Sequence, residues 1–294
     1  MNHEEKYFKH KKAVVDQALD DYIPNAETRP QRLHQAMRYS VFAGGKRIRA
    51  MICLAAVEAV GGNERSALLP AMALEVFHTY TLIHDDLPAM DDDDLRRGQP
   101  TCHKAFGEAN AILAGDALLT MAFEWVGACY APPLYPPNQL SIELAKAGGS
   151  QGVIAGQVED MASEGKESTL EQVEYIHGKK TAVLFRVACR MGGIAGGANH
   201  KELEALSKYG NGVGLAFQIA DDILNETGTE EALGKAVGSD REKNKSTYVT
   251  LLGLDEAASR AQESIDQALA ALKVLPGPIE PLKKIAHFCM SRSS

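Results

Sequence analysis

An acidic run that follows an apolar stretch constrains this chain more than any other feature. Six aspartates lie within residues 85–94, and Arg96 and Arg97 follow almost at once. Apolar residues such as Phe77 and Leu82 come before them, so we expect the run to follow a buried helix. An acidic run is usually a solvated surface patch, but these neighbours argue against that interpretation. Carboxylates this close repel one another unless cations lie among them. The run therefore favours bound divalent cations, with the two arginines available to an anion on the metal.

Pro88 lies in the middle of this run and predicts a break in the helix. Proline cannot continue a helix, so we expect the backbone to open between Asp86 and Asp91. In an unbroken helix Asp85 and Asp91 would lie about 120° apart around the axis and point away from each other. The break would let both carboxylates turn toward one site.

The rest of the chain has helical periodicity nearly throughout, without an alternating β pattern, a repeat or a linker. We predict one all-α domain over residues 1–294, a single large bundle of about ten helices around a central cavity. The predicted helical stretches are 31–43, 50–60, 68–84, 109–130, 140–161, 169–188, 201–225, 249–272 and 282–290. Segment 226–246 breaks this pattern and is predicted to be a long functional loop.

Composition excludes several classes of protein. A net charge of −8, from 31 basic and 39 acidic residues, makes nucleic acid an improbable partner. Five scattered cysteines without a C-x-x-C pair indicate a reducing compartment. The most apolar long stretch, 111–134, contains Asp116, Glu124 and prolines, so it predicts a buried helix and no membrane span. The N-terminus lacks the apolar core of a signal peptide, and we expect a cytoplasmic protein.

A second acidic pair, Asp221 and Asp222, also follows an apolar helical stretch. Asp221 and Asn225 are four residues apart and share one helix face. Two such pairs on facing helices could clamp a diphosphate through shared Mg²⁺ ions. Taken alone, the second pair could equally be a helix end, but the first acidic run predicts a partner across the cavity.

Several basic and polar residues could neutralise such a diphosphate. Lys46, Arg47 and Arg49 follow two glycines, whose amides can approach an anion closely. His78 lies seven residues before Asp85 on the same helix face. The other candidates are Lys179, Lys180 and Thr181 in a helical stretch, and Lys235 and Lys245 in the long loop. Each alone is more often a solvated or core residue, but together they provide what a bound diphosphate needs.

In this order the motifs resemble the trans-isoprenyl diphosphate synthases, most closely the bacterial farnesyl diphosphate synthases. The resemblance covers almost the whole chain. Its markers are residues 44–49, 85–91 with 96–101, 152 through 156–160, 179–181, and 217–218 with 221–222. It implies an all-α homodimer that depends on Mg²⁺, with Mn²⁺ also possible. The implied reaction condenses isopentenyl diphosphate with dimethylallyl or geranyl diphosphate to give (E,E)-farnesyl diphosphate.

The resemblance also implies roles for individual residues. The metal site would be formed by Asp85, Asp86, Asp91 and Asp221, with Asp85, Asp91 and Asp221 as the direct ligands. The allylic diphosphate or its neighbours would be contacted by Arg96, Lys180, Thr181, Gln218 and Lys235, and Lys245 would also bind substrate. The isopentenyl diphosphate site would contain Lys46, Arg49, His78 and Arg97. The residues expected to be catalytic are Asp85, Asp91, Arg96, Lys180, Asp221 and Lys235.

Product length is predicted from the residues just before the first acidic run. Tyr80 and Thr81 lie five and four residues before Asp85, thus about 6–8 Å deeper along a helix. An aromatic ring there can close the pocket for the growing tail, and within the family this resembles the farnesyl (C15) pattern. The alternative is that Tyr80 is an ordinary core residue.

One departure from the family pattern concerns the second acidic motif. Asn225 stands where the family usually has aspartate, and it keeps an oxygen ligand but loses a negative charge. We therefore expect weaker Mg²⁺ binding on that side with activity retained. Three alternatives remain: a geranylgeranyl (C20) synthase, a terpene cyclase, or a catalytically weak partner subunit of a prenyl synthase. A cyclase would not need Lys46, Arg49 and Arg97, which suit a second diphosphate, and only Asn225 favours the partner subunit.

Overall fold

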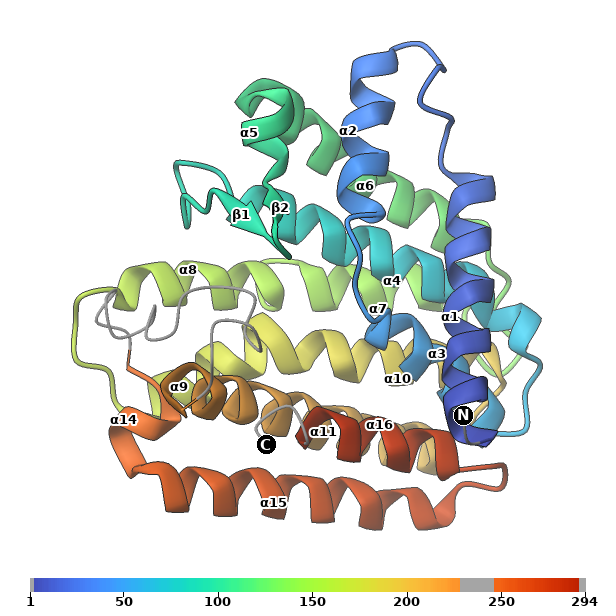
Figure 1. Cartoon of the computed structure of the whole chain (residues 1–294). Coiled ribbons are helices and arrows are strands. Elements are labelled where there is room, and N and C mark those ends of the chain that lie inside the picture. The colour runs from blue at the N-terminus through green and yellow to red at the C-terminus, as the bar shows by residue number, and fades with distance from the viewer. Residues whose placement is uncertain (1–2, 228–245, 291–294) are drawn as a thin grey trace.

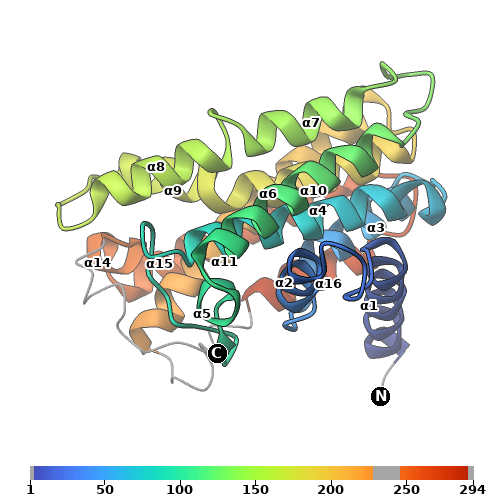
Figure 2. The same ribbon diagram turned by 90° about the horizontal axis from the view of Figure 1, so that it is seen from above.

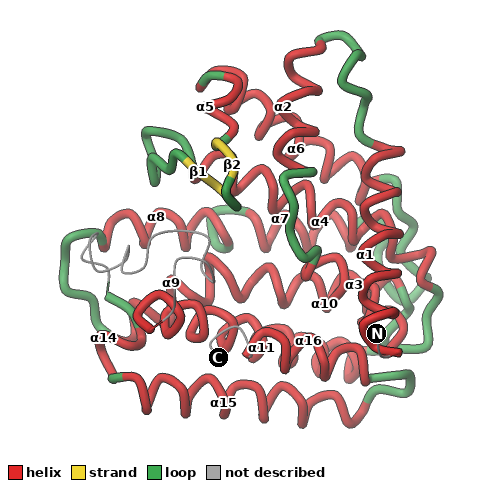
Figure 3. The backbone as a smooth tube through the Cα atoms, viewed as in Figure 1, coloured by secondary structure: helices red, strands yellow, loops and turns green. Residues whose placement is uncertain are grey.

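The computed structural model of the chain describes residues 3–227 and 246–290, and nearly all of its regular structure is helical (Figures 1 and 3). The longer helices are α1 (His3–Tyr22), α2 (Gln31–Val41), α3 (Ile48–Ala59), α4 (Glu64–Asp85), α6 (Glu108–Gly127), α7 (Gln139–Gly148), α8 (Val153–Ser163), α9 (Leu170–His177), α10 (Val183–Ala195), α11 (His200–Thr227), α15 (Leu254–Ala271) and α16 (Glu280–Met290). The shorter segments are α5 (Cys102–Phe106), α14 (Tyr248–Leu252), the π-helical turn η1 (Gly178–Ala182) and the 3₁₀ turn η2 (Leu272–Val274). The all-α class predicted from the sequence is confirmed.

Helix α10 is the centre of the bundle. It packs against α3, α4, α7 and α11, and most of its residues are buried. Gly192 permits one of these contacts, because a Cβ there would lie 2.1 Å from the carbonyl oxygen of Cys53 in α3. Helix α15 lies along α11 on the outside (Figure 1). Seen from above, α7 and α8 follow one edge of the molecule and α1 lies at the opposite edge (Figure 2).

Local sequence explains where several helices begin and end. The Asn63 side chain caps α4 by accepting a hydrogen bond from the Arg65 amide at 3.0 Å. Thr169 begins α9 with a capping box, whose partner is Gln172. Helix α3 stops before Gly61, where φ is +75°. Both ends lie close to the bounds of the predicted stretches 169–188 and 50–60.

The structure also corrects several predicted boundaries. The stretch 140–161 is two helices, because Gly149 ends α7 and the chain turns before Val153. The stretch 249–272 is divided at Gly253, where φ is +82°. Helix α1 was not among the predicted helices, and α11 continues through Thr227 into the segment predicted as loop.

Two short strands and one proline also differ from expectation. Leu95–Arg96 (β1) and Gln99–Pro100 (β2) form a minimal antiparallel hairpin directly after the acidic run. No strand had been predicted, since two residues are too few for an alternating pattern to register. Pro70 lies inside α4, because the helix starts at Glu64, before the predicted start at residue 68.

Within the described residues, α4 is the one helix long and apolar enough to cross a membrane. Its most apolar window is 67% buried inside the fold, as expected for the core helix of a bundle. The sequence prediction had instead taken 111–134 as the most apolar stretch.

Candidate active site

The acidic run begins where α4 ends, and the chain turns back on itself there. Helix α4 ends at Asp85, and the Asp91 amide donates a hydrogen bond to the Asp85 carbonyl oxygen at 2.9 Å. The Asp92 amide likewise donates to the Leu87 carbonyl at 3.2 Å. The opening predicted around Pro88 is therefore present, and it brings the backbones of Asp85 and Asp91 together.

Asp85 lies in a buried and strongly charged environment. Burial raises the pKa of Asp85 to about 6, and the negative charge of Asp91 adds to this effect while the Lys180 ammonium opposes it. The α4 end and the η1 turn therefore face each other across the site. Closely placed, partly buried carboxylate oxygens are the ligands that Mg²⁺ or Mn²⁺ would take, so the donor set fits a hard divalent cation. Among the described residues, no three such side chains already form a closed ligand set.

Asp86 differs from Asp85 because its carboxylate is bound by Arg96. The Asp86 side chain is 3% exposed. Arg96 Nε donates to Asp86 Oδ1 at 2.7 Å and to Oδ2 at 2.9 Å, and Nη2 also donates to Oδ1. Asp86 was predicted as part of the metal site, but both of its oxygens are used here to hold Arg96. Asp86 therefore holds Arg96 in this structure, and its part in the metal site stays a prediction.

A second cationic group forms beside this hairpin. Arg97 donates to the carbonyl oxygen of Gly44, and a Cβ at Gly45, where φ is +118°, would lie 2.8 Å from Arg97 Nη1. His78 belongs to the same group, because burial and then the charges of Arg49 and Arg97 hold its pKa well below the usual range. His78 is therefore neutral at pH 7 and can donate or accept a hydrogen bond.

Arg49 is the most buried cation of this group. Burial lowers its pKa to about 10, so it remains charged at neutral pH, and its guanidinium lies 5.4 Å from the centre of the Phe185 ring. Its buried Nε has no hydrogen-bond partner among the described residues. A buried donor without a partner lowers the stability of the fold. This is consistent with a site in which a bound anion would accept the hydrogen bond. Arg49, Arg97 and His78 therefore lie near one another, and their role in binding isopentenyl diphosphate stays a prediction.

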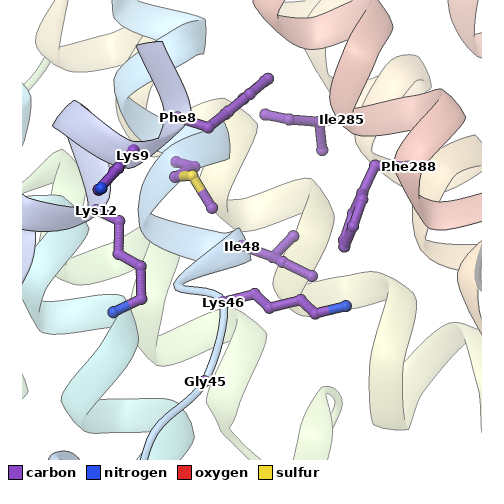
Figure 4. A pocket seen from close by; sticks show the side chains of 9 residues that line it. Phe8, Lys9, Lys12, Gly45, Lys46, Ile48, Ile285 and Phe288 are labelled. Carbon is purple, nitrogen blue, oxygen red and sulfur yellow. The ribbon is translucent and has the colours of Figure 1, made fainter. Parts of the chain in front are cut away.

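Lys46 and Arg47 point elsewhere than the motif alone suggested. Lys46 Nζ lies 4.4 Å from the centre of the Phe288 ring, at the edge of an apolar pocket of about 360 Å³ between α1, α3 and α16 (Figure 4). Arg47 turns inward and pairs with Asp16 at 2.8 Å and with Glu75 at 3.6 Å. Arg47 therefore ties α1 to the core, whereas a role of Lys46 in phosphate binding stays a prediction and would require its side chain to turn away from Phe288.

Lys180 and Thr181 lie in the π-helical turn η1. Lys180 Nζ pairs with Asp160 of α8 at 2.7 Å. Helix α8 approaches this turn closely at Gly156, where a Cβ would lie 2.3 Å from the Lys180 amide nitrogen. Such single π turns often mark functional sites. The sequence predicted these two residues but gave no sign of the π turn or of the Asp160 pair.

Thr181 connects this turn to the second acidic pair. Thr181 Oγ1 donates to Gln218 Oε1 at 2.8 Å. Asp221 follows Gln218 by three residues, about one helical turn or ~4.5 Å along α11, and it is half-buried. The η1 turn therefore holds Lys180, whose charge acts on Asp85, next to Thr181, which is hydrogen-bonded to α11. Asn225, one turn further, is 3% exposed.

Tyr80 and Thr81 lie below Asp85 on α4, and both are buried. The Tyr80 ring makes edge contacts with Phe77 at 5.0 Å and with His84 at 5.4 Å, measured between ring centres. The charge of Asp85 contributes to the raised pKa of Tyr80, which is mainly an effect of burial. The Tyr80 ring therefore lies in a row with the rings of Phe77 and His84, N-terminal to Asp85 on α4. A residue that closes the pocket for the growing tail would occupy such a position.

Two of the predicted residues, Lys235 and Lys245, lie outside the described residues, as does most of the predicted loop. Conversely, the prediction gave no role to Asp160, His177 and Tyr248, which support this region. Asp160 belongs to the motif 152–160, so the sequence marked it as a residue of interest. The sequence did not indicate that it pairs with Lys180.

Comparisons with known proteins show the family of the chain. The family model described as polyprenyl synthetase matches residues 30–275. The chain belongs to the polyprenyl synthetase family. The resemblance to trans-isoprenyl diphosphate synthases is thereby confirmed, and the chain is a prenyltransferase of that kind.

Relatives of the polyprenyl synthetase differ in product. A farnesyl diphosphate synthase from Geobacillus stearothermophilus is 46% identical over 92% of this chain and 91% of its own length. A heterodimeric geranylgeranyl pyrophosphate synthase large subunit from Arabidopsis thaliana is also 46% identical, over 97% of this chain and 78% of its own. Among solved structures, a geranylgeranyl pyrophosphate synthetase from Pyrococcus horikoshii matches with a TM-score of 0.88 at 34% identity, covering 97% of both chains. An FPP/GFPP synthase from Zymomonas mobilis matches with a TM-score of 0.85 at 36% identity, covering 97% and 98%.

Proposed function

We propose that this polyprenyl synthetase is a Mg²⁺-dependent farnesyl diphosphate synthase that condenses isopentenyl diphosphate with dimethylallyl or geranyl diphosphate. The observation that supports the proposal is the presence of two groups of charged side chains, each of which could bind a diphosphate. One lies between the two acidic helix ends, with Lys180 and Arg96 beside it. The other is the group of Arg49, Arg97 and His78. Two diphosphates in one reaction need two such sites, whereas a cyclase acts on one.

The residues account for the chemical steps. Magnesium held by Asp85, Asp91 and Asp221 would neutralise the diphosphate that leaves the allylic substrate. As the allylic C–O bond breaks, Lys180 and Arg96 stabilise the charge that develops on that diphosphate. The alkene of isopentenyl diphosphate, held by Arg49 and its neighbours, then bonds to the allylic carbon, and a proton leaves the adjacent carbon. The apolar walls of the bundle exclude water, which would otherwise capture the allylic cation.

The farnesyl product is proposed from the position of Tyr80. This ring is 8% exposed and forms an aromatic row with Phe77 and His84 below Asp85. A tail growing down from the metal site would meet this row, which supports a short product. The competing candidate is a geranylgeranyl diphosphate synthase, which the names of several relatives favour.

Product analysis tests both candidates directly. The purified protein is incubated with isopentenyl diphosphate, geranyl diphosphate and Mg²⁺, and the products are dephosphorylated and separated by length. We expect a C15 alcohol and no turnover with excess chelator. A dominant C20 product would favour the geranylgeranyl synthase. If turnover occurred only after a second prenyl synthase chain was added, the protein would be a partner subunit. Asn225 is the residue that favours this role.

We also propose that the protein is a cytoplasmic homodimer built from one domain over residues 1–294. Exposed apolar side chains on α6 and α8, among them Leu113 and Val158, support self-association. The five cysteines are all free thiols, which agrees with a reducing compartment. Light scattering after size-exclusion chromatography should give twice the mass of 31.7 kDa.

A further inference from the structure

Asp222 is buried directly beside the proposed metal ligand Asp221. The residue is 5% exposed, whereas Asp221 is half-buried. The two neighbours lie on one helix, α11, but about 100° apart around its axis, so they face different surroundings. The sequence had grouped them as a pair that clamps metal-bound diphosphate.

The carboxylate of Asp222 joins two parts of the fold. Its Oδ2 accepts a hydrogen bond from the Tyr248 amide at 3.0 Å, and its Oδ1 accepts one from Gln218 Nε2 at 3.4 Å. Tyr248 is the first residue of α14, which begins shortly after the gap between the described ranges 3–227 and 246–290. Gln218 in turn accepts a hydrogen bond from Thr181 of the η1 turn. One buried carboxylate therefore spans from the diphosphate side of α11 to the start of α14.

His177 completes the packing around this carboxylate. Its Nε2 lies 3.8 Å from Asp222 Oδ2, and its ring centre lies 5.3 Å from that of Tyr248. Burial lowers the pKa of His177 to about 4, so the ring is neutral at pH 7 and the contact is not an ion pair. The ring shields the Asp222 hydrogen bonds from water, which strengthens them.

We propose that Asp222 is a positioning residue and not a metal ligand: it fixes Gln218, and through it Thr181, against the first turn of α14. The inference rests on the proposed function, because Gln218 and Thr181 matter only if they contact the allylic diphosphate. The hydrogen-bonded connection between α11 and α14 can be tested without any enzymatic activity.

The test compares Asp222→Asn with Asp221→Asn, the same substitution at adjacent positions. For Asp222→Asn we expect hydrogen exchange of the α14 amides in the ligand-free protein to rise about tenfold, since a charge-assisted hydrogen bond is weakened. The KM for geranyl diphosphate should rise about tenfold, while the Mg²⁺ concentration at half-maximal activity changes less than about twofold. For Asp221→Asn the Mg²⁺ requirement should rise at least about tenfold, with α14 exchange unchanged.

Two results would overturn the inference. One is an Asp222→Asn enzyme whose Mg²⁺ requirement rises as much as that of Asp221→Asn. The other is unchanged exchange in α14. If Asp222→Asn does not fold, Asp222→Ser keeps a hydroxyl acceptor and is judged by the same measurements. If the unmodified protein has no prenyltransferase activity, the proposed function fails, but the exchange comparison still decides whether Asp222 holds α14.

Discussion

Arg96 Nε donates to both carboxylate oxygens of Asp86, at 2.7 and 2.9 Å. This contact fixes the Arg96 guanidinium at the edge of the acidic site. It also neutralises the Asp86 carboxylate, which would otherwise add to the negative charge there. Asp222 is used in a similar way on α11, where it holds the start of α14. In both acidic pairs the second aspartate is buried against a neighbouring element, and the first is the one proposed here as a metal ligand.

Asp86→Asn should weaken the contribution of Arg96 to catalysis more than it weakens metal binding. Hydrogen bonds to a charged partner contribute about 1.5–3 kcal/mol, so we expect a loss of stability in that range and at least a tenfold fall in kcat/KM. The Mg²⁺ requirement should change less than it does in Asp85→Asn. Urea unfolding and a Mg²⁺ titration of both variants check this. An Asp86→Asn enzyme with the Mg²⁺ requirement of Asp85→Asn would contradict the positioning role.

Metal affinity should depend on pH through Asp85, whose pKa is raised to about 6. Mg²⁺ binds the carboxylate form, so below pH 6 it must displace a proton, and the apparent affinity should fall about tenfold for each pH unit. Above pH 6 the carboxylate is already ionised and the affinity should level off. Calorimetric titration of the substrate-free protein with Mg²⁺ between pH 5 and 8 measures this. In Asp85→Asn the step at pH 6 should disappear.

Tyr80→Ala should lengthen the product. Removing the ring opens the space beneath Asp85 in the row that Phe77 and His84 share with it. We expect C20 or longer products from the alanine variant, whereas Tyr80→Phe, which keeps the ring, should still stop at C15. Chromatography of the dephosphorylated products gives the answer. An alanine variant with no product longer than that of the parent would show that Tyr80 is only a core residue.

Gly156→Ala should displace the π turn. The added Cβ would lie 2.3 Å from the Lys180 amide nitrogen, so either α8 or the turn must shift. Overpacking of this kind costs about 1–3 kcal/mol, and here it should also lower kcat by moving Lys180. Gly127→Ala is the matched control, because a Cβ there meets nothing within 4 Å. Thermal unfolding and steady-state kinetics of both variants distinguish a local effect from a general one.

Asn225→Asp should restore the carboxylate usual in the family and reduce the Mg²⁺ needed for half-maximal activity. Asn225 shares a helix face with Asp221, so the new charge would act on the same ion. Because the side chain is 3% exposed, the added charge should also lower stability when Mg²⁺ is absent. Melting temperatures with and without Mg²⁺, together with a Mg²⁺ titration of activity, test both parts. An unchanged Mg²⁺ requirement would count against a metal near this position.

Much of the fold and the site could be predicted because their signals are local. Helical periodicity revealed most helices, and Pro88 indicated the turn that brings Asp85 to Asp91. The roles of Asp86 and Arg47 could not be predicted, because the direction of each side chain is decided by partners distant in sequence, as with Asp16 for Arg47. Lys46 likewise meets a ring from the last helix. A hairpin of four residues is too short to leave a sequence pattern.

The π turn at Gly178–Ala182 determines how the fold would respond to the deletion of a residue in this segment. It holds one residue more than a regular helical turn, and the widened turn absorbs that residue without a break between α9 and α10. Loss of a single residue here would leave a regular α-helical turn, so α10 could keep its packing while Lys180 and Thr181 would change direction. A deletion in this turn would therefore act on the site more than on the bundle.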